Sequence, residues 1–454
     1  MERSRRLPSA LRNFTVGALA ALLSGIVIYA SRIVFLSKMD VEYVGYTALF
    51  EHAFILLSSL DLGITSSLTS YMASKMAGGK EEEERGALEI AKRIYVGVSL
   101  LILLSGTIFA FFFSLVENKN SSVFFSCLFY FTGQCAQYLF GWRVLAMNVE
   151  GRNDIVSIFV QGGRILSYTL GTLLLVITGS FLIYSLVSSL FVFLSFFFLH
   201  IYSVRIIPWM KGKTVYRNKN DEKRLLLTLP AMGMHRIGSV FFRAYEIIAV
   251  TFLFGAREGG KYSNLLMVST ALLTVFWIIQ SSLTGIVGEH YAKENVKDSW
   301  KLFSSLSRWN YLLSLALGLG FVVFGTKIAV LSFGEANVPG KMVGSIMGIE
   351  LFLLSSRTSS LIMRDAEGEY VGDWWKTILE IVFALGLNLL FRERMESAAV
   401  PLSISISLLF VTIPVENYIV SEKMEKGSGR KRALFSLFLA IFGIVVVSVA
   451  SVVI

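Results

Sequence analysis

Charged residues are scarce in this chain of 454 residues. Only 16% are Asp, Glu, Lys or Arg, whereas 54% are hydrophobic. A soluble globular domain has about 25% charged residues. The shortage excludes an ordinary soluble domain and indicates that most of the chain lies in a membrane.

Cysteine and long polar segments are also rare. Cys127 and Cys135 lie eight residues apart in one apolar stretch, without a CxxC motif or a nearby histidine pair, which favours reduced thiols. The longest internal polar stretch, 205–224, is too short for a catalytic domain with paired carboxylates. The GSGRK segment at 427–431 lacks the spacing of a phosphate-binding loop. We therefore expect no catalytic residue, no metal, no cofactor and no enzymatic activity.

Long apolar runs dominate the rest of the sequence, and thirteen of them have about the length of a membrane-spanning helix. They cover approximately 13–36, 43–73, 94–116, 122–146, 154–178, 180–204, 225–254, 262–287, 309–326, 342–363, 374–391, 399–420 and 433–454. The runs are continuous and not alternating, which predicts helices and excludes barrel strands. The first run follows a basic segment but is too long for the apolar part of a signal peptide. We expect it to remain as an uncleaved helix.

Lys and Arg residues are distributed unequally between the connections. Starting from a cytoplasmic N-terminus, the cytoplasmic side holds 29 of the 42 basic residues and the opposite side holds eight. This bias predicts a multi-pass protein of the cell (plasma or inner) membrane with its N-terminus in the cytoplasm. It also accounts for the net charge of +10 without nucleic-acid binding.

The basic stretch at 205–224 divides the sequence into two halves. We predict an N-terminal bundle of six helices (1–204), a cytoplasmic linker (205–224), a C-terminal bundle of six helices (225–421), and a basic loop with a thirteenth helix (422–454). VEYVGYTALF at 41–50 is faintly echoed by REGGKYSNLL at 257–266. Such an echo is typical of transporters built from two related halves.

Arg143 and Lys376 lie near the cytoplasmic ends of their runs and are counted with the cytoplasmic residues. The other five basic residues within the apolar runs are all arginines: Arg32, Arg164, Arg236, Arg243 and Arg357. A charge at the centre of a bilayer costs at least about 2.5 to 3.5 kcal/mol. Arginine has a planar fork of donors that matches phosphate oxygens. The pattern predicts a cavity that binds an anion. Two alternatives stay open, namely snorkelling of Arg32 and Arg357 to the interface and pairing of Arg243 with Glu246.

Ionisable side chains of another kind also lie within the runs. The candidates for ion or proton coupling are Glu51, Asp61, His235, Glu246 and Glu350. Glu380 and Glu416 are further buried acids. The alternative, that these acids neutralise the arginines, is equally compatible with the sequence.

Four segments together resemble a known family. They are SRIVFLSKMDVEYVGYTALF (31–50), LDLG (60–63), the charged KMAGGKEEEERGALEIAKR (75–93), and LLLTLPAMGMHRIGSVFFRAYEIIAV (225–250). This layout resembles the Wzx-type polysaccharide flippases of the MOP superfamily, which are related to MATE drug exporters and lipid II flippases. The resemblance implies an all-α membrane protein with two six-helix bundles arranged as a V, here with an extra C-terminal helix.

The resemblance also implies the cargo, an oligosaccharide linked through phosphate or pyrophosphate to a polyprenol. Arg32 and Arg243 match arginine positions of the family, whose cavity cations hold the phosphate. Tyr245 and Glu246 depart from the family, which often has Asp followed by Arg or Lys there. Relatives commonly have twelve or fourteen helices.

The expected function is therefore to flip a lipid-linked oligosaccharide from the cytoplasmic to the outer leaflet by alternating access. Expected partners are this substrate, membrane lipids, and a glycan polymerase or glycosyltransferase of the same pathway. A lipid II flippase is an alternative that differs only in cargo. A cation-coupled drug exporter is disfavoured by five arginines, and a structural scaffold would leave them unexplained.

Overall fold

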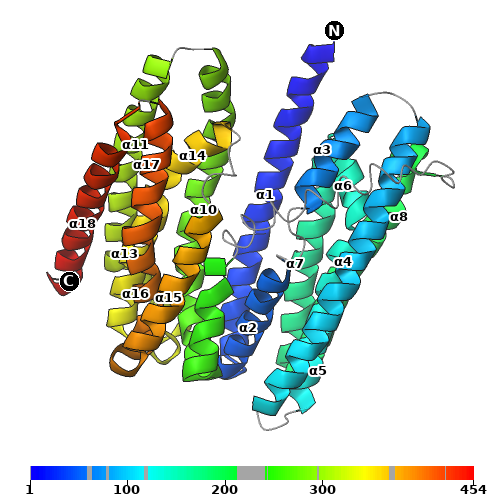
Figure 1. Cartoon of the computed structure of the whole chain (residues 1–454). Coiled ribbons are helices and arrows are strands. Elements are labelled where there is room, and N and C mark those ends of the chain that lie inside the picture. Colours follow the sequence, from blue (N-terminus) through cyan, green and yellow to red (C-terminus); the bar gives the residue numbers. More distant parts are fainter. Residues whose placement is uncertain are drawn as a thin grey trace. The chain divides into compact units, whose positions relative to one another are not determined.

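The computed structural model describes residues 2–58, 64–77, 81–116, 121–211, 241–242, 244–293, 296–367, 374–424 and 426–453 (Figure 1). Within these ranges the chain is almost entirely helical and has no β-strand, which confirms the all-α prediction. The described residues fall into two compact units. The first lies within 1–40 and 50–237, and the second within 41–49 and 238–454.

The helices of the first unit follow the predicted runs closely. They are α1 (Glu2–Leu36), the second part of α2 (Val41–Ser58), α3 (Ile64–Ala77), α4 (Glu81–Val116), α5 (Ser121–Leu139), α6 (Gly141–Val149), α7 (Asn153–Thr178), α8 (Phe181–Ile206) and the 3-10 turn η2 (Pro208–Met210). The predicted run 43–73 contains two helices, α2 and α3, and the run 122–146 contains α5 and most of α6. Apolar composition does not mark where one helix ends and the next begins, because both helices of each pair are apolar.

A tight turn joins α7 to α8. Gly179 ends α7 in the left-handed conformation with a φ of 63°, which a glycine adopts without steric cost. The Ser180 hydroxyl then caps α8 by accepting a hydrogen bond from the Ile183 amide at 3.4 Å. The two helices consequently run back along each other.

Small residues hold α7 against α8. Gly163, Ser167 and Gly171 lie at four-residue intervals, are buried, and form what we call the small-residue seam. The Ser167 hydroxyl donates to the Ser188 carbonyl of α8 at 2.8 Å, and a Cβ on Gly163 would collide with Ser195. Small residues let the backbones of membrane helices approach closely. The seam thereby fixes the rotation of α7 about its own axis.

Adjacent glycines in α7 provide a matched test of this seam. We expect Gly163→Ala to destabilise the protein by about 1 to 3 kcal/mol through overpacking against Ser195. Gly162→Ala should stabilise it by about 0.5 to 1 kcal/mol, because nothing lies within 4 Å of the added Cβ and alanine favours the helix. Unfolding of both variants in detergent measures the difference. Equal stabilities would contradict the close helix approach.

The second unit begins with the first part of α2 and the helix Ala244–Phe254. It continues with α10 (Ala256–Lys293), α11 (Val296–Gly320), the π-turn η3 (Phe321–Gly325), α12 (Thr326–Phe333), the 3-10 turn η4 (Glu335–Asn337), α13 (Lys341–Ser356), α14 (Thr358–Glu367), α15 (Trp374–Met395), the 3-10 turn η5 (Glu396–Ala398), α16 (Ala399–Ser407), the π-turn η6 (Leu408–Thr412), α17 (Ile413–Met424) and α18 (Gly429–Val453). The helix α18 corresponds to the thirteenth predicted run.

The two segments that echo each other in sequence pack together in this unit. A Cβ on Gly45 of α2 would collide with the carbonyl of Ala256, and a Cβ on Gly260 of α10 would collide with the carbonyl of Val41. The contact is reciprocal, because each glycine faces the first turn of the other helix. Glycine is required at both positions for the backbones to approach this closely.

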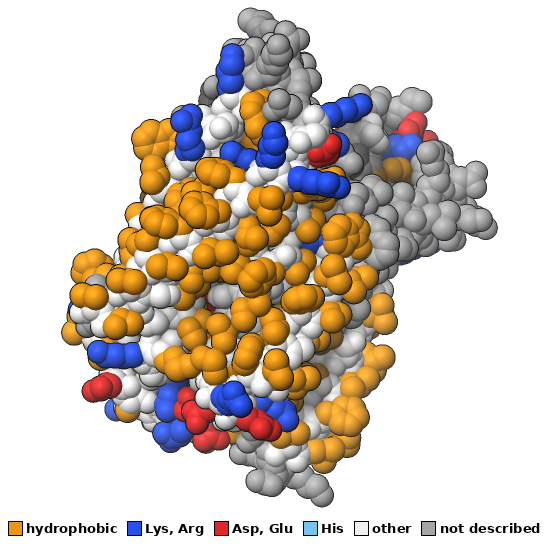
Figure 2. All heavy atoms as spheres, turned by 60° about the vertical axis from the view of Figure 1, so that its left-hand side comes forward, with side chains coloured by type: hydrophobic (Ala, Val, Ile, Leu, Met, Phe, Trp, Pro, Cys, Tyr) orange, Lys and Arg blue, Asp and Glu red, His pale blue; other side chains and the backbone are white. Residues whose placement is uncertain are grey.

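The described helices suit a membrane environment. Eight of the helices or continuous helical stretches in the described ranges are long and apolar enough to cross a bilayer. Figure 2 shows a face on which hydrophobic side chains form a broad band, with charged side chains gathered at its two ends. This pattern is that of a multi-pass membrane protein, as the sequence predicted.

Candidate functional site

Arg164 lies on the polar side of α7. The large exposed apolar residues of this helix, which form its lipid-facing stripe, are Ile158, Leu166, Leu173, Val176 and Ile177. At about 100° per residue, Arg164 falls on the opposite side of the helix from this stripe. Its exposed side chain is flanked by the half-buried Gln161 and Tyr168. A charged side chain in a spanning helix faces protein or water and avoids lipid, so this polar stripe is the side of α7 that faces away from lipid.

Helix α1 runs beside α7 in the same direction. The Asn13 side chain donates to the Gly151 carbonyl at 2.8 Å and accepts from the Asp154 amide at 3.2 Å, across sequence separations of 138 and 141 residues. Arg12 adds an ion pair with Asp154 at 3.0 Å. This register places Arg32 of α1 about one turn beyond Tyr168 on α7. The second predicted arginine therefore lies close to the first.

A cluster of tyrosines joins these two arginines. Both Arg32 and Arg164 interact electrostatically with the enclosed hydroxyl of Tyr168, and Arg32 also interacts with Tyr184 of α8. Tyr184 forms a hydrogen bond with Ser188. The arrangement brings residues of three helices together around phenol hydroxyls, all within the first unit.

One predicted acid belongs to the same cluster. Glu51 of α2 interacts electrostatically with Tyr168 and with Tyr130 of α5, and its side chain is exposed. Neither Glu51 nor Arg164 forms an ion pair or hydrogen bond with another residue in the described part of the chain. We call Arg32, Glu51, Tyr168 and Arg164 the arginine cluster. Its two arginines and one glutamate give it a formal charge of one positive unit.

The chemical capacity of the arginine cluster follows from these groups. Two guanidinium groups offer several N–H donors in fixed planes, and tyrosine hydroxyls can both donate and accept. Such donors suit phosphate oxygens, whose charge-assisted hydrogen bonds are about twice as strong as neutral ones. The cluster is thus equipped to bind an anion.

The second unit contains a buried pair of carboxylic acids. Glu246, in the helix Ala244–Phe254, and Glu350 of α13 interact with each other, and each is at least 95% buried. The hydroxyl of the fully buried Tyr262 donates to Glu246 at 2.9 Å. Two ionised carboxylates at these positions would repel each other, and a proton on one of them would remove that repulsion. One oxygen of Glu350, Oε1, makes no hydrogen bond with any residue that the structure describes.

Arg357 occupies a different environment from Arg32 and Arg164. It lies between α13 and α14 and holds Glu416 of α17 with two hydrogen bonds, of 2.5 and 3.1 Å. Lys376 of α15 donates to the same carboxylate at 2.6 Å. Only 2% of the Glu416 side chain and 16% of the Arg357 side chain are exposed. For Arg357, therefore, the structure shows the alternative arrangement, in which a buried acid neutralises the arginine.

The surrounding groups extend this ion network, which comprises Arg357, Arg364, Lys376, Glu380 and Glu416. Arg364 lies 3.9 Å from Glu416, and Lys376 lies 3.9 Å from Glu380. Thr412, the last residue of the π-turn η6, donates to Glu380 at 2.5 Å. The network therefore ties α15 and α17 to the junction of α13 and α14.

Several predicted site residues lie outside the described residues. These are Asp61, His235, Arg236 and Arg243. The predicted pairing of Arg243 with Glu246 is therefore outside the description as well, and these assignments stay predictions.

Sequence reasoning missed three residues at these clusters. Tyr168 had a usable signal, because it stands four residues after Arg164 on one helix face. Lys376 lies four residues before Glu380 inside the run 374–391, yet was counted with the cytoplasmic residues; the structure buries it to 3% exposure. Tyr262 lies within the echo segment 257–266 and carries no sequence signal for its contact with Glu246.

No metal-binding constellation occurs in the described ranges. No group of three or more His, Cys, Asp or Glu side chains is arranged there to hold an ion. Cys127 and Cys135 are free and buried within α5.

Comparison with known proteins identifies the fold. No family model and no curated protein sequence matches the chain. The structure is similar to the lipid II flippase MurJ in an inward closed conformation, with a TM-score of 0.67 and 15% identity over 96% of this chain and 98% of that one. It is similar to an inward-facing multidrug resistance MATE transporter of the MOP superfamily, with a TM-score of 0.64 and 12% identity over 93% and 95%.

A further similar structure is a MOP superfamily transporter from Pyrococcus furiosus, with a TM-score of 0.56 and 14% identity over 97% of this chain and 94% of that one. These likenesses show that the chain has the MATE and MurJ fold. At such identities they show the fold alone.

Proposed function

We propose that this protein flips an oligosaccharide linked through phosphate or pyrophosphate to a polyprenol, from the cytoplasmic to the outer leaflet. The observation that carries the proposal is that Arg32 and Arg164 both interact with Tyr168, on the side of α7 that faces away from lipid. The fold supports it, because similar structures include a lipid II flippase and exporters. The same similarity supports a transporter and not an enzyme.

The physical task explains the arginines. Phosphate and sugar groups lose their hydration when they cross about 30 Å of hydrocarbon. The arginine cluster replaces that hydration with fixed N–H donors, while the apolar tail of the cargo stays in lipid. On the basis of the sequence, we propose that Arg236 and Arg243 also bind the phosphate. Arg357 acts differently, since Glu416 already binds its guanidinium.

Coupling to an ion gradient is assigned to the buried acids Glu246 and Glu350. We propose that the pair holds one proton in the closed site, and that this proton is released to water or exchanged for a sodium ion when the site opens. Loss of the proton would leave two buried charges side by side, which is unfavourable enough to favour another conformation. Glu51 is a second candidate because it lies beside the arginines, where it would compete with a bound phosphate.

Replacing Glu350 with Gln tests this coupling. Glutamine keeps the size and polarity of the side chain but cannot release a proton. In vesicles with an imposed proton or sodium gradient, we expect the roughly fivefold or larger stimulation of transport in the wild type to disappear. Glu393→Gln, which changes an exposed acid of α15, is the control. Undiminished stimulation in Glu350→Gln would rule out this pair as the coupling site.

The alternatives differ in cargo. A lipid II flippase would use the same pyrophosphate site, so the arginine cluster is compatible with it. A drug exporter that carries cations is less compatible, because an exposed arginine repels such cargo. We further propose an inner or plasma membrane location with a cytoplasmic N-terminus, and association with a glycan polymerase or glycosyltransferase that handles the same lipid-linked glycan.

A flipping assay in vesicles tests the function. The full chain is reconstituted with a fluorescent prenyl pyrophosphate disaccharide, and a membrane-impermeant reductant reports how fast the lipid reaches the outer leaflet. The control cargo is the same disaccharide on the uncharged prenol. Transport that requires the pyrophosphate supports the proposal. Equal rates for both cargoes, or rates no higher than those of empty vesicles, would refute it.

A further inference from the structure

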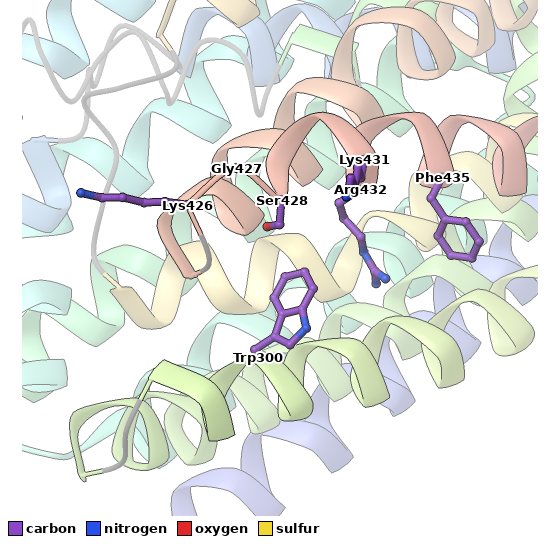
Figure 3. A pocket seen from close by; sticks show the side chains of 7 residues that line it. All are labelled: Trp300, Lys426, Gly427, Ser428, Lys431, Arg432 and Phe435. Atoms are coloured by element: carbon purple, nitrogen blue, oxygen red, sulfur yellow. The ribbon is translucent and has the colours of Figure 1, made fainter.

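A basic pocket lies at the start of α18, remote in sequence from the arginine cluster. Its volume is about 510 Å³, and it is lined by Trp300, Lys426, Gly427, Ser428, Lys431, Arg432 and Phe435 (Figure 3). Trp300 belongs to α11, and the other residues belong to α18 and the turn that precedes it. The pocket lies wholly within the second unit.

The turn before α18 is fixed by its own hydrogen bonds. The Glu422 carboxylate accepts from the amides of Gly427 and Gly429 at 2.9 and 3.0 Å. The Ser428 hydroxyl donates to the Ser421 carbonyl at 2.9 Å, and Gly427 has a φ of 86° that favours glycine. Because Glu422 already binds two of the free amides at this end of the helix, an incoming anion must be held by side chains.

Arg432 supplies an unused donor in the pocket. Its side chain extends from α18 toward α11, where Trp300 rises to meet it (Figure 3). The guanidinium carbon lies 5.3, 5.8 and 5.9 Å from the ring centres of Phe303, Phe435 and Trp300. These rings hold the guanidinium in place. Its Nε is buried and makes no hydrogen bond with any described residue.

The charge of the pocket is unbalanced. Segment 422–432 contains five basic and two acidic residues. Neither Lys431 nor Arg432 forms an ion pair with a residue that the structure describes, and Arg308 of α11 adds a further positive charge near Arg432. Lys426 points away from Trp300 in Figure 3, so Lys431 and Arg432 are the principal cations. The pocket is therefore complementary to an anion.

The position of the pocket indicates which anion. The apolar part of α18 begins immediately after Arg432, and Leu434, Phe435 and Phe438 are exposed on it. The pocket thus joins a basic site to a surface that faces lipid. Basic pockets at the end of membrane helices suit anionic lipid headgroups, which supply a phosphate and acyl chains at this level.

We infer that this pocket binds the headgroup phosphate of an anionic phospholipid, through Lys431 and Arg432, with its acyl chains against the exposed face of α18. The site is independent of the transported cargo. It goes beyond the proposed function because it assigns α18, the helix beyond the two bundles of six, a lipid-binding role. A soluble phosphate shares the headgroup chemistry but would gain nothing from the apolar face.

Binding to the purified full chain in a neutral detergent tests the inference. The probes are short-chain phosphatidylglycerol, short-chain phosphatidylcholine with the same acyl chains, and inorganic phosphate, each followed by titration calorimetry. We expect phosphatidylglycerol to bind at least about tenfold more tightly than either of the others, since only it combines an uncompensated negative phosphate with acyl chains. Equal affinity for the two lipids overturns the inference. Inorganic phosphate that binds as tightly as phosphatidylglycerol overturns the assignment to a lipid.

Variants locate the site. In Lys431→Gln/Arg432→Gln, phosphatidylglycerol should bind about tenfold or more weakly, because at least one charge-assisted hydrogen bond is lost. The single variant Lys431→Gln changes only an exposed side chain. It therefore tests the pocket even if loss of Arg432 prevents the double variant from folding. Arg394→Gln, at the exposed end of α15, removes the same charge elsewhere and should bind like the wild type. An undiminished preference in both pocket variants would contradict the inference.

Discussion

Replacing Glu416 with Gln should destabilise the protein by about 3 to 5 kcal/mol, which is the usual effect of removing one partner of a buried ion pair. Glu416 is hydrogen-bonded to both Arg357 and Lys376, and its side chain is 2% exposed. Glutamine would leave these cations without their shared negative charge. Thermal unfolding in detergent, compared with Glu393→Gln on the exposed side of α15, measures the loss.

The double variant Arg357→Gln/Glu416→Gln measures how much of the stability comes from the interaction between the two charges. If the pair is held by its charges, removing both should cost less than the sum of the two single losses, with a coupling of about 1 to 3 kcal/mol. Additive losses would mean that Arg357 and Glu416 stabilise the protein independently. That result would also remove the reason for treating Arg357 differently from the other buried arginines.

Replacing Arg164 with Gln should slow transport of the pyrophosphate-linked cargo by about 10- to 100-fold, because one or more charge-assisted hydrogen bonds to phosphate are lost. The variant should fold normally, since the exposed Arg164 makes no ion pair with a described residue. Arg164→Lys should lie in between, because lysine keeps the charge but not the planar fork. The flipping assay in vesicles measures all three proteins.

Arg205→Gln is the matched control for Arg164. Arg205 is also exposed and lies in the last turn of α8, in the same unit. Its loss should leave transport unchanged. If Arg164→Gln transports at the rate of Arg205→Gln, the polar side of α7 does not bind the phosphate.

The sequence predicted the helices well where each run contained one helix. The run 154–178 corresponds to α7, Asn153–Thr178, and the run 180–204 to α8, Phe181–Ile206. It could not predict the π-turns η3 and η6, because a shift from i+4 to i+5 hydrogen bonds leaves composition unchanged. The runs 309–326 and 399–420 therefore each contain an interruption of the regular α-helix that their composition does not reveal.

The candidate sites show a similar limit. Sequence identified Arg32 and Arg164 as unusual, because a charge within an apolar run has a known cost. That they converge on Tyr168 depends on the packing of α1 against α7, which hydropathy does not contain. In the same way, the sequence singles out Glu246 and Glu350 individually, but their interaction with each other depends on tertiary structure.

The ion network around Glu416 was the least predictable feature. Arg357 looked identical to the other buried arginines in sequence, since its partner lies 59 residues away on another helix. The distinction between an arginine that binds cargo and one that binds a carboxylate is a property of the neighbours. Only the structure separates Arg357 from Arg164.

The most direct test of the central claim is equilibrium binding to the purified protein. A short-chain prenyl pyrophosphate disaccharide is compared with its neutral, dephosphorylated analogue, in the wild type and in Arg164→Gln. The account predicts a strong preference of the wild type for the pyrophosphate and its loss in the variant. Equal binding of the two compounds by the wild type would contradict the account and would favour an exporter of uncharged or cationic cargo.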